Sequence, residues 1–553
     1  MQSLFEQHRA TLEAALTALQ QRGFWTAYPE VPSGKFYGET AKDDGLAAYN
    51  ATLNSPFDLP GHPGAYTVGQ EQSPYGPVLG ITYPAVDAQA LVTHSQAAAK
   101  AWAAASHEAR AGVCLEILDR LNKRSFEMAH AVMHTSGQAF PMAFQAGGPH
   151  AQDRGLEALA YAWAEMARIP AEAQWVKPQG KAGDLVLEKH WQIIPRGVSV
   201  LIGCQTFPTW NSYSGLFANL MTGNTVIAKP HPAAILPMAI TVQVARAVLT
   251  EQGFPADVVL LAAEDAGTGL AKDLAEHPDV AQIDYTGSHT FGKWLRANAA
   301  TPLVYTEEAG VNSIVVSATD DFKGMCQNIA FSLALYSGQM CTAPQNIFIP
   351  KTGIRAGDGH KTLEEVQQGI AAAIDGLLAD PARAAMVAGA LANTDTLERV
   401  QSMRNVAPIV RDSAPIEGLE GARTATPLLL SVQAEDETLY GAECFGPIVF
   451  LVAVDSAEEG VRRAATLART KGAITAALYE TDADATQVAI QAFAAAGVNL
   501  SINLMGGIYV NQSAAFSDFH VTGANPAGNA CVADAAFVAN RFRVVMWRRP
   551  VTL

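Results

Sequence analysis

The chain has 553 residues, of which 49% are hydrophobic and 16% charged, with 45 glycines and 29 prolines. This length accommodates about two to four domains, and the composition excludes a disordered or collagen-like chain. The 53 acidic residues outnumber the 37 Lys and Arg residues, and the net charge of −16 disfavours binding to nucleic acid or to an anionic membrane surface.

The start of the chain and the cysteine content indicate a cytoplasmic protein. The first segment, MQSLFEQHRATLEAALTALQQRG, carries Glu6 and Glu13 and is typical of an amphipathic helix, not of a secretion signal. Six cysteines without a CxxC pair predict reduced thiols and no structural zinc. Because no apolar run approaches about 18 residues, we expect no membrane span.

The pattern of residues predicts helices first and two α/β units afterwards. Residues 24–75 are rich in Pro, Gly and aromatic residues and predict an extended arm, whereas residues 87–168 repeat apolar residues at helical spacing. From Arg196, apolar runs such as GVSVLIG, NTVIAKP and DVVLLAA alternate with helical segments. Such alternation is typical of a parallel, doubly wound sheet.

A second set of alternating segments follows, with SIVVSA, QNIFIP and PIVFLVAV as strands. We therefore expect an α/β fold of two doubly wound domains that meet near residue 310. The β-rich end, FVANRFRVVMWRRPVTL, predicts a strand that pairs between subunits. The expected units are an amino-terminal helix and arm at 1–75, a dinucleotide-binding domain at 76–310 with a hairpin near 176–195, a catalytic domain at 311–510, and an oligomerisation segment at 511–553.

The segment SGQMCTAPQNIFIP, residues 337–350, contains the best candidate for a nucleophile. Cys341 follows a predicted helix and precedes a predicted strand, and Gly338 permits close approach of the backbone. A thiol surrounded by backbone N–H groups can be held as a thiolate and can attack a carbonyl carbon. An inert, buried cysteine is the alternative that this segment alone leaves open.

With its companions, GQMC resembles the nucleophile motif GQxC of the aldehyde dehydrogenase superfamily. The companions occur in the family's order: TGNTVIAKP (222–230), DYTGS (284–288), VYTEEAGVNSIVV (304–316) and ECFGPIV (443–449). The resemblance runs from about residue 76 to 530. The long amino-terminal arm, FPTWNSY and KPHP are most similar to the phenylacetic acid degradation protein PaaN type of this superfamily.

The resemblance implies a catalytic role for three residues. Cys341 would attack the aldehyde, and Glu307, in EEAGVNS, would activate the water that hydrolyses the thioester. Glu308 is the neighbouring alternative, and because adjacent residues of a strand face opposite ways, only one of the two can face the site. Thr206 takes the place of the asparagine that donates to the oxyanion in the family motif NFP.

Thr206 and EEAGV are the two departures from the family pattern. The Thr206 hydroxyl is shorter than an amide, so oxyanion stabilisation would depend on this hydroxyl, on Gln205 or on Asn211. EEAGV stands where ELGGK is usual, which places Ala309 for Gly and Val311 for Lys. These departures motivate a further hypothesis, that of a catalytically weak scaffold subunit that kept the fold.

The implied cofactor is NADP, with NAD as the possible alternative. In the family pattern KPSE a glutamate binds the adenosine ribose and repels a 2′-phosphate, whereas this chain has Pro232 at that position. With no carboxylate there, Lys229 would remain a cation and His231 would add a donor for the phosphate. The residues expected to bind the cofactor are Lys229, His231, Gly287, Ser288, Gly292, Glu443 and Phe445.

The complete expectation is an NAD(P)-dependent aldehyde dehydrogenase that forms a thiohemiacetal and a thioester on Cys341. The resemblance implies a CoA-linked semialdehyde from phenylacetate catabolism as the substrate. A CoA-acylating aldehyde dehydrogenase, in which CoA resolves the thioester, is the alternative enzyme. The histidines form no HxxxH or HxxEH set, so no metal is expected. A homodimer or homotetramer is expected, with a small aldehyde as the partner.

Overall fold

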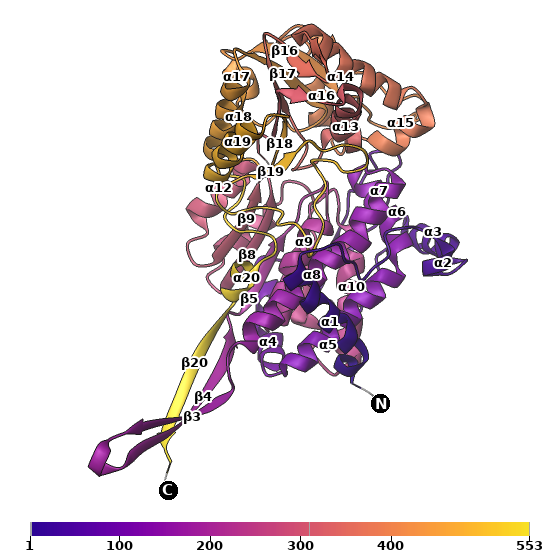
Figure 1. Ribbon diagram of the computed structural model, residues 1–553. Coiled ribbons are helices and arrows are strands. Elements are labelled where there is room, and N and C mark those ends of the chain that lie inside the picture. The colour runs from indigo at the N-terminus through magenta and orange to yellow at the C-terminus, as the bar shows by residue number, and fades with distance from the viewer. Residues whose placement is uncertain (1–2, 309, 552–553) are drawn as a thin grey trace.

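The structure is a computed structural model that describes residues 3–308 and 310–551. Ala309 of the EEAGV segment therefore lies outside the described residues. Two large β-sheets, each flanked by helices, form the body of the molecule, and a narrow β-ribbon projects from it (Figure 1). The expected α/β fold with two doubly wound domains is thereby confirmed. Among the described helices, none is both long and apolar enough to cross a membrane.

The first sheet has five parallel strands in the order β7-β6-β5-β8-β9. The chain starts in the middle with β5, runs outward through β6 and β7, and then returns to the other side of β5 with β8 and β9. All residues of β5, β6 and β7 are buried, which explains their continuous apolar runs. The strands are β5 (Val198–Ile202), β6 (Thr225–Lys229), β7 (Val259–Leu261), β8 (Val280–Gly287) and β9 (Leu303–Glu308), and the helices are α9 (Trp210–Met221), α10 (Leu236–Glu251), α11 (Leu270–Glu276) and α12 (His289–Asn298).

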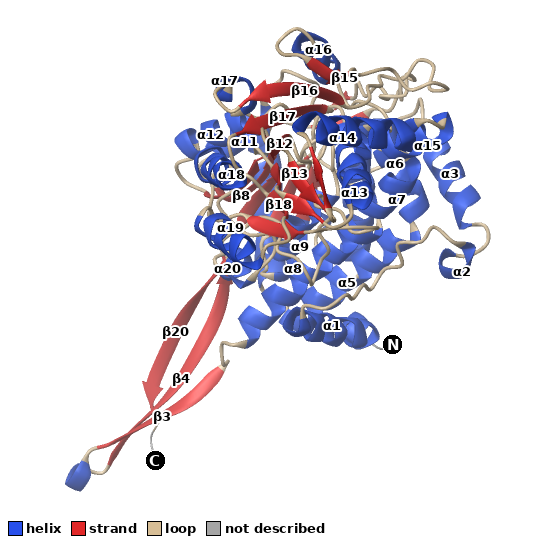
Figure 2. Ribbon diagram, turned by 45° about the horizontal axis from the view of Figure 1, so that its top comes forward, coloured by secondary structure: helices blue, strands red, loops and turns tan. Residues whose placement is uncertain are grey.

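The second sheet has seven strands in the order β15-β16-β17-β12-β10-β18-β19, and only β15 is antiparallel to its neighbour. Its helices lie on both faces (Figure 2). The strands are β10 (Ser313–Val316), β12 (Asn346–Pro350), β15 (Ile409–Arg411), β16 (Leu428–Gln433), β17 (Ile448–Val454), β18 (Thr475–Tyr479) and β19 (Asn499–Ile502). The helices are α13 (Phe322–Ala334), α14 (Leu363–Leu378), α15 (Pro381–Ala388), α16 (Thr394–Met403), α17 (Glu437–Tyr440), α18 (Ala457–Lys471) and α19 (Ala483–Ala495), and a small sheet joins β11 (Ala318–Thr319), β13 (Ile354–Ala356) and β14 (Gly359–Lys361).

A layer of helices from the amino-terminal part of the chain packs against the first sheet. Segment 24–75, expected to be an extended arm, also contains two helices, α2 and α3, besides extended chain. The helices of this part are α1 (Leu4–Gln21), α2 (Gly34–Tyr37), α3 (Ala41–Thr52), α4 (Ala88–Ala103), α5 (His107–Lys123), α6 (Ser125–Ser136), α7 (Phe140–Gly147) and α8 (Pro149–Ala167), and the strands are β1 (Tyr66–Val68) and β2 (Tyr83–Ala85).

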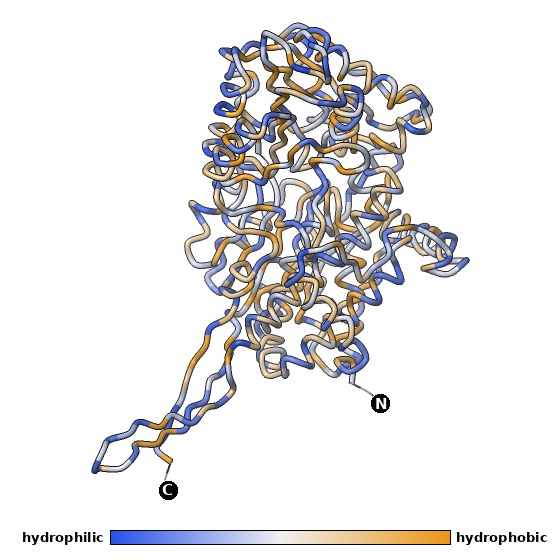
Figure 3. The backbone as a smooth tube through the Cα atoms, viewed as in Figure 1, coloured by the Kyte–Doolittle hydropathy of each residue, from blue (hydrophilic) through white to orange (hydrophobic). Residues whose placement is uncertain are grey.

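The carboxy-terminal strand β20 (Phe542–Pro550) pairs within its own chain. It runs antiparallel to β4 (Asp184–Pro195), which forms a hairpin with β3 (Glu172–Pro178). One edge of this strand is thus covered within the chain, because the hairpin offers a long strand beside it, and the pairing between subunits stays a prediction for the other edge. The ribbon lies away from the body and carries hydrophobic stretches (Figure 3). After helix α20 (Ala535–Ala539), Arg541 anchors the ribbon through two buried contacts with Asp284, at 2.7 and 2.6 Å.

Candidate active site

Cys341 lies in the loop between α13 and β12, which leads into the second sheet. The Asn312 side-chain amide donates to the Cys341 carbonyl at 2.8 Å and to the Ala343 carbonyl at 2.9 Å. The Asn312 side-chain oxygen in turn accepts the backbone N–H groups of Ile474 and Thr475, at 2.9 and 3.0 Å. One asparagine therefore ties the cysteine loop to the chain that enters β18, which holds the Cys341 backbone in place.

The chain before Cys341 has an unusual local conformation. Tyr336 and Ser337 have φ angles of 50°, and Gly338 has a φ angle of 63°. A Cβ atom on Gly338 would lie 2.6 Å from the carbonyl oxygen of Gly446. The glycine of GQMC thus permits the close contact with the ECFGPIV segment. The sequence predicts such a close approach of the backbone at Gly338.

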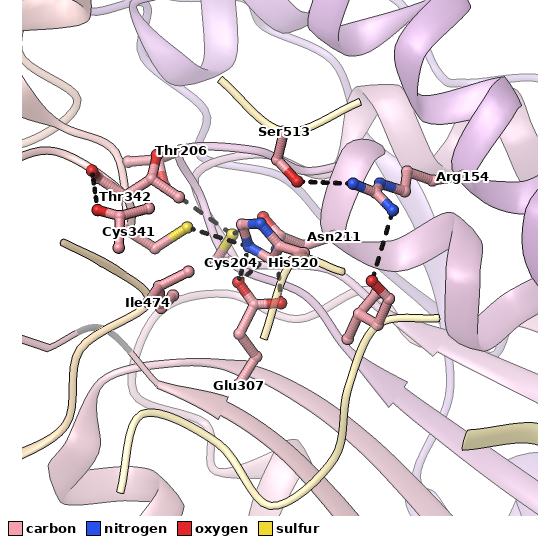
Figure 4. A network of polar contacts seen from close by, with 12 residues as sticks. Arg154, Cys204, Thr206, Asn211, Glu307, Cys341, Thr342, Ile474, Ser513 and His520 are labelled. Atoms are coloured by element: carbon pink, nitrogen blue, oxygen red, sulfur yellow. Dashed lines mark hydrogen bonds and ion pairs between the residues drawn. The ribbon is translucent and has the colours of Figure 1, made fainter. Parts of the chain in front are cut away.

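Glu307, at the end of β9, lies beside Cys341 in a buried cluster of polar groups (Figure 4). Its carboxylate oxygens each accept from the Asn211 side-chain amide at 3.0 Å, and Oε1 lies 2.9 Å from Nε2 of His520. The same Nε2 lies 3.6 Å from the Cys341 sulfur. The sulfur, the imidazole nitrogen and a carboxylate oxygen all lie within 4.8 Å of one another.

Glu308 points away from this cluster. Its carboxylate contacts Arg296 and lies 2.5 Å from Nδ1 of His289, both on α12. The two adjacent glutamates therefore occupy opposite faces of β9, and the face of Glu307 is that of Cys341.

The ionisation of Cys341 and Glu307 is coupled. Burial raises the pKa of the Cys341 thiol well above its ordinary value, and the Glu307 carboxylate raises it further. Burial would also raise the pKa of Glu307, but its contacts with His520, Cys341 and Asn211 outweigh burial and lower this pKa below its ordinary value. In the resting site the carboxylate is therefore ionised and the thiol holds its proton.

Thr206 does not contact Cys341. Its hydroxyl donates to the sulfur of Cys204 at 3.9 Å, so the expectation that this hydroxyl donates to an oxyanion on Cys341 finds no support in the geometry. The Gln205 amide is likewise occupied, because it donates to the carbonyls of Thr135 and Ala392 at 3.2 and 3.0 Å. Of the three candidate oxyanion donors, only the Asn211 side chain points into the cluster. Asn211 lies in the first turn of α9.

His520 is the residue that sequence reasoning missed. Only 3% of it is exposed, and the Trp210 ring packs edge-on against its imidazole with a centroid separation of 4.6 Å. It follows Phe519 in the segment SDFHV, which has no motif spacing to Cys341 or Glu307. From the sequence, His231 is the only histidine expected near a ligand, whereas the fold brings His520 to Cys341 from 179 residues further along the chain.

A cavity of about 1030 Å³ opens onto Cys341 and His520. Aromatic side chains from distant segments line it, and two of them, Phe24 and Trp25, come from the amino-terminal segment. Its lining contains no Lys or Arg among the described residues, whereas it includes the carboxylates of Glu30, Asp153 and Asp518. An anionic ligand would thus find the imidazoles of His150 and His520 but no Lys or Arg in the described lining of this cavity.

The carboxyl edge of the first sheet has the features of a dinucleotide site. Lys229 ends β6 and Gly287 ends β8, and these two strands flank β5, where the strand order reverses. Ligands of open α/β sheets bind at such a reversal point. The residues therefore fit a nicotinamide dinucleotide, and Lys229 and Ser288 are the side chains that would hold it.

Lys229 has a carboxylate partner, although Pro232 removes the one that the family pattern supplies. It is buried and pairs with Glu264, whose other carboxylate oxygen accepts the backbone N–H of Leu270 at 2.9 Å. Burial lowers the pKa of Lys229, and the Glu264 charge opposes this change. His231 is exposed, and its Nδ1 accepts the Ala233 N–H at 3.2 Å, so the ring already has a local partner.

The other predicted cofactor residues lie at strand and helix ends. Ser288 caps α12 through its hydroxyl, which accepts the Phe291 N–H at 3.3 Å. Gly287 and Gly292 leave room for side chains of the same chain, the Tyr285 ring and the Glu308 carboxylate, and Gly292 is buried instead of open to a phosphate.

Glu443 and Phe445 lie in the loop before β17. Glu443 is exposed, and Phe445 is half-buried. The Phe445 carbonyl accepts from the guanidinium of Arg399 at 2.6 Å, which orders this loop.

Comparisons with known proteins agree with the fold and with the family resemblance. Residues 81–519 match the family model described as "Aldehyde dehydrogenase family". A crystal structure described as an NAD-dependent aldehyde dehydrogenase from Burkholderia multivorans is 52% identical, covers 100% of both chains and has a TM-score of 0.98. A Thermus thermophilus 1-pyrroline-5-carboxylate dehydrogenase mutant, at 18% identity and a TM-score of 0.73, covers 96% of this chain and 99% of its own, and shows the fold alone.

Two curated relatives are semialdehyde dehydrogenases. The alpha-ketoglutaric semialdehyde dehydrogenase of Bacillus subtilis is 26% identical over 386 residues, which is 68% of this chain and 74% of the relative. The N-succinylglutamate 5-semialdehyde dehydrogenase of Burkholderia multivorans is 26% identical over 275 residues, 49% of this chain and 53% of the relative. The match thus spans about half the length of the second relative.

Proposed function

The chain belongs to the aldehyde dehydrogenase family, and from that premise we propose that it oxidises an aldehyde to a carboxylic acid, with Cys341 as nucleophile and Glu307 as base. The observation that carries this proposal is that Cys341 and Glu307 lie in one buried cluster. This cluster opens onto a cavity large enough for a substrate. A nicotinamide dinucleotide, when bound at the edge of the first sheet, supplies the acceptor for the hydride.

The residues of the chain act in two stages. Cys341 attacks the carbonyl carbon, and the thiol proton passes to Glu307, the nearest ionised carboxylate. After the loss of the hydride, a thioester joins the acyl group to Cys341. Glu307 releases this proton to solvent and, ionised again, takes a proton from a water molecule, which attacks the thioester. The C–S bond then breaks, the acid is released and the Cys341 thiolate is restored. The side-chain amide of Asn211 is the candidate oxyanion donor, because it is the one of the three that contacts Glu307; to serve the oxyanion it would give up one of its two contacts with this carboxylate.

The substrate that suits the cavity is an aldehyde whose reacting end is uncharged. The walls are largely apolar and aromatic, Glu30 pairs with His150, and burial raises the pKa of Asp153 to about 7. No Lys or Arg of the described lining would bind an anionic substrate. A semialdehyde bearing a free carboxylate close to its carbonyl would therefore bind poorly. A CoA-linked semialdehyde from phenylacetate catabolism, as the resemblance to the PaaN type implies, satisfies this condition, because its charged groups lie at the far end of a long neutral arm.

For the cofactor, we favour NAD over the NADP that Pro232 predicts. Glu264 brings to Lys229 the carboxylate that Pro232 does not supply, and a carboxylate repels a 2′-phosphate. The crystal structure at 52% identity is described as that of an NAD-dependent enzyme, which supports the same choice. NADP stays the alternative.

The projecting ribbon supports a homodimer or homotetramer. On β20 the side chains of Val545, Met546 and Trp547 are 45%, 45% and 49% exposed, and the strand has one edge without a partner in the described chain. An exposed apolar edge of this kind favours pairing with a second subunit. A cytoplasmic location is proposed from the six free cysteines.

An absorbance assay of the reduced cofactor tests this function. Purified protein is supplied with NAD or NADP and a series of neutral and carboxylated aldehydes of matched length, each with and without CoA. Formation of the free acid without CoA supports hydrolysis by Glu307. Turnover that requires CoA would indicate the acylating alternative, and no reduction of either cofactor with any aldehyde would indicate the scaffold.

A further inference from the structure

The imidazole of His520 has no task in the two stages described above, although it touches both reacting groups. Its Nε2 lies 3.6 Å from the Cys341 sulfur and 2.9 Å from Oε1 of Glu307 (Figure 4). Both contacts are made by the same nitrogen. A distance of 3.6 Å is long for an N–H···O bond but ordinary for a bond to the larger sulfur atom.

The surroundings of the ring determine where its proton lies. Nδ1 of His520 is buried and has no hydrogen-bond partner among the described residues. A proton on Nδ1 would thus be a buried donor without an acceptor, and the lone pair left on Nε2 would face the Glu307 carboxylate. The network therefore assigns the proton to Nε2, from which it is donated to Oε1.

A thiolate at Cys341 needs such a donor. Burial and the adjacent Glu307 carboxylate both raise the pKa of this thiol, so the cluster by itself disfavours the reactive form. In the described part of the chain, no Lys or Arg side chain pairs with Glu307 or lines the cavity. The Nε2–H of His520 is the group whose hydrogen bond can stabilise a negative sulfur.

We propose that His520 is a catalytic residue, which donates its Nε2–H to Glu307 in the resting enzyme and to the Cys341 thiolate when the nucleophile ionises. In this step the S–H bond of Cys341 breaks and its proton forms an O–H bond on Glu307. The Nε2–H bond remains intact, and no electrons are exchanged. The neutral Glu307 carboxyl group is a weaker hydrogen-bond acceptor than the carboxylate. At the same time the sulfur becomes negative and is then the stronger acceptor for Nε2–H.

The ring is well placed to serve two acceptors without moving. Trp210 packs against it, and the Arg154 guanidinium lies over the Trp210 ring, 5.2 Å from its centroid. Arg154 is itself held by Glu157, at 2.7 Å. The ionisable groups around the imidazole are thus Cys341 and Glu307 in contact, with the Arg154 pair behind the indole.

This role rests on the proposed function, but it is tested on the thiolate itself. Iodoacetamide alkylates thiolates, so its rate of reaction with Cys341 reports the ionised fraction without substrate turnover. The rate of alkylation is measured from pH 6 to 10 in steps of about one pH unit. Mass spectrometry of the peptide that contains Cys341 follows the reaction. His520→Ala removes the donor, whereas His520→Gln keeps an N–H on a neutral side chain. His134→Gln is the matched control, since His134 also packs against aromatic rings but outside the site.

We expect His520→Ala to alkylate about tenfold more slowly at pH 7, with its profile displaced by about one pH unit upward. His520→Gln should recover most of this rate, and His134→Gln should match the unchanged protein. An unaltered profile in a folded His520→Ala protein would overturn the proposal. A folded His520→Gln protein as slow as His520→Ala would also overturn it, because the ring would then act through its charge. Alkylation as expected, without oxidation of any aldehyde, would refute the proposed function alone.

Discussion

Replacing Glu307 by Gln separates the two stages of the proposed reaction. The carboxylate accepts two contacts from the Asn211 amide and one from Nε2 of His520. A glutamine has a single acceptor oxygen, so its own NH₂ group must face one of these donors. One buried donor is then left without a partner, which costs about 1–3 kcal/mol in the free energy of unfolding.

The effect on turnover should be larger than the effect on stability. Loss of a general base lowers a rate by about 10²- to 10⁴-fold, which corresponds to about 3–5 kcal/mol of transition-state free energy at 1.36 kcal/mol per tenfold. The first stage should survive with a slower burst, because the thiol proton that Glu307 accepts in the unchanged protein must then pass to solvent. Removal of the Glu307 charge takes away one of the causes that raise the pKa of Cys341, which favours the thiolate.

Rapid mixing with cofactor and aldehyde measures both stages. Glu307→Gln should retain a burst of about one reduced cofactor per site, followed by a steady-state rate reduced as above. Glu308→Gln is the matched control, because this adjacent carboxylate faces Arg296 and His289 on the other side of β9. An undiminished steady state would refute the role of Glu307 as base, and disappearance of the burst would show that the first stage requires Glu307 as the acceptor of the thiol proton.

The same variant predicts a change in the pH dependence of stability. The pKa of Glu307 is lowered in the folded protein, so its contribution to stability is present above the ordinary glutamate value of 4.5 and is lost as the pH falls through the folded pKa. The difference in unfolding free energy between the unchanged protein and Glu307→Gln should thus shrink below pH 4.5. Denaturant unfolding at several pH values measures it.

Three further changes test the nucleophile, the cofactor and the assembly. Cys341→Ala should abolish aldehyde oxidation while cofactor binding persists, and oxidation near the original rate would exclude the covalent route. Glu264→Gln should shift the ratio of kcat/KM for NADP over NAD upward by about tenfold, because a like charge near the 2′-phosphate disappears; an unchanged ratio would show that the pair with Lys229 does not select the cofactor. Val545→Lys and Trp547→Lys together should yield smaller particles in sedimentation if the ribbon joins subunits, and an unchanged sedimentation coefficient would place the interface elsewhere.

The assembly test replaces a simpler deletion for a structural reason. Removing the residues after Asn540 would also remove Arg541, which neutralises the buried Asp284 carboxylate. A buried charge that loses its partner costs about 3–5 kcal/mol. The truncated chain would then fail to fold whether or not the ribbon joins subunits.

Much of the fold and part of the site follow from local patterns in the sequence. The continuous apolar runs predict buried parallel strands, since such strands have both faces covered. The GQMC segment identifies Cys341, and the alternation of side chains along β9 leaves only one of Glu307 and Glu308 able to face it. These inferences succeed because each depends on residues that are neighbours in the chain.

Other features were decided only by the tertiary structure. His520 contacts Glu307 across 213 residues, and no motif spacing in SDFHV predicts that contact. Lys229 finds Glu264 in the loop after β7, and β20 finds β4 at the other end of the chain. In each case a charge or a strand edge is satisfied by whichever group the packed sheets bring near it. The sequence shows which charged groups and strand edges need partners once they are buried. Because burial makes any suitable partner favourable, only the packing of distant segments determines which group becomes the partner.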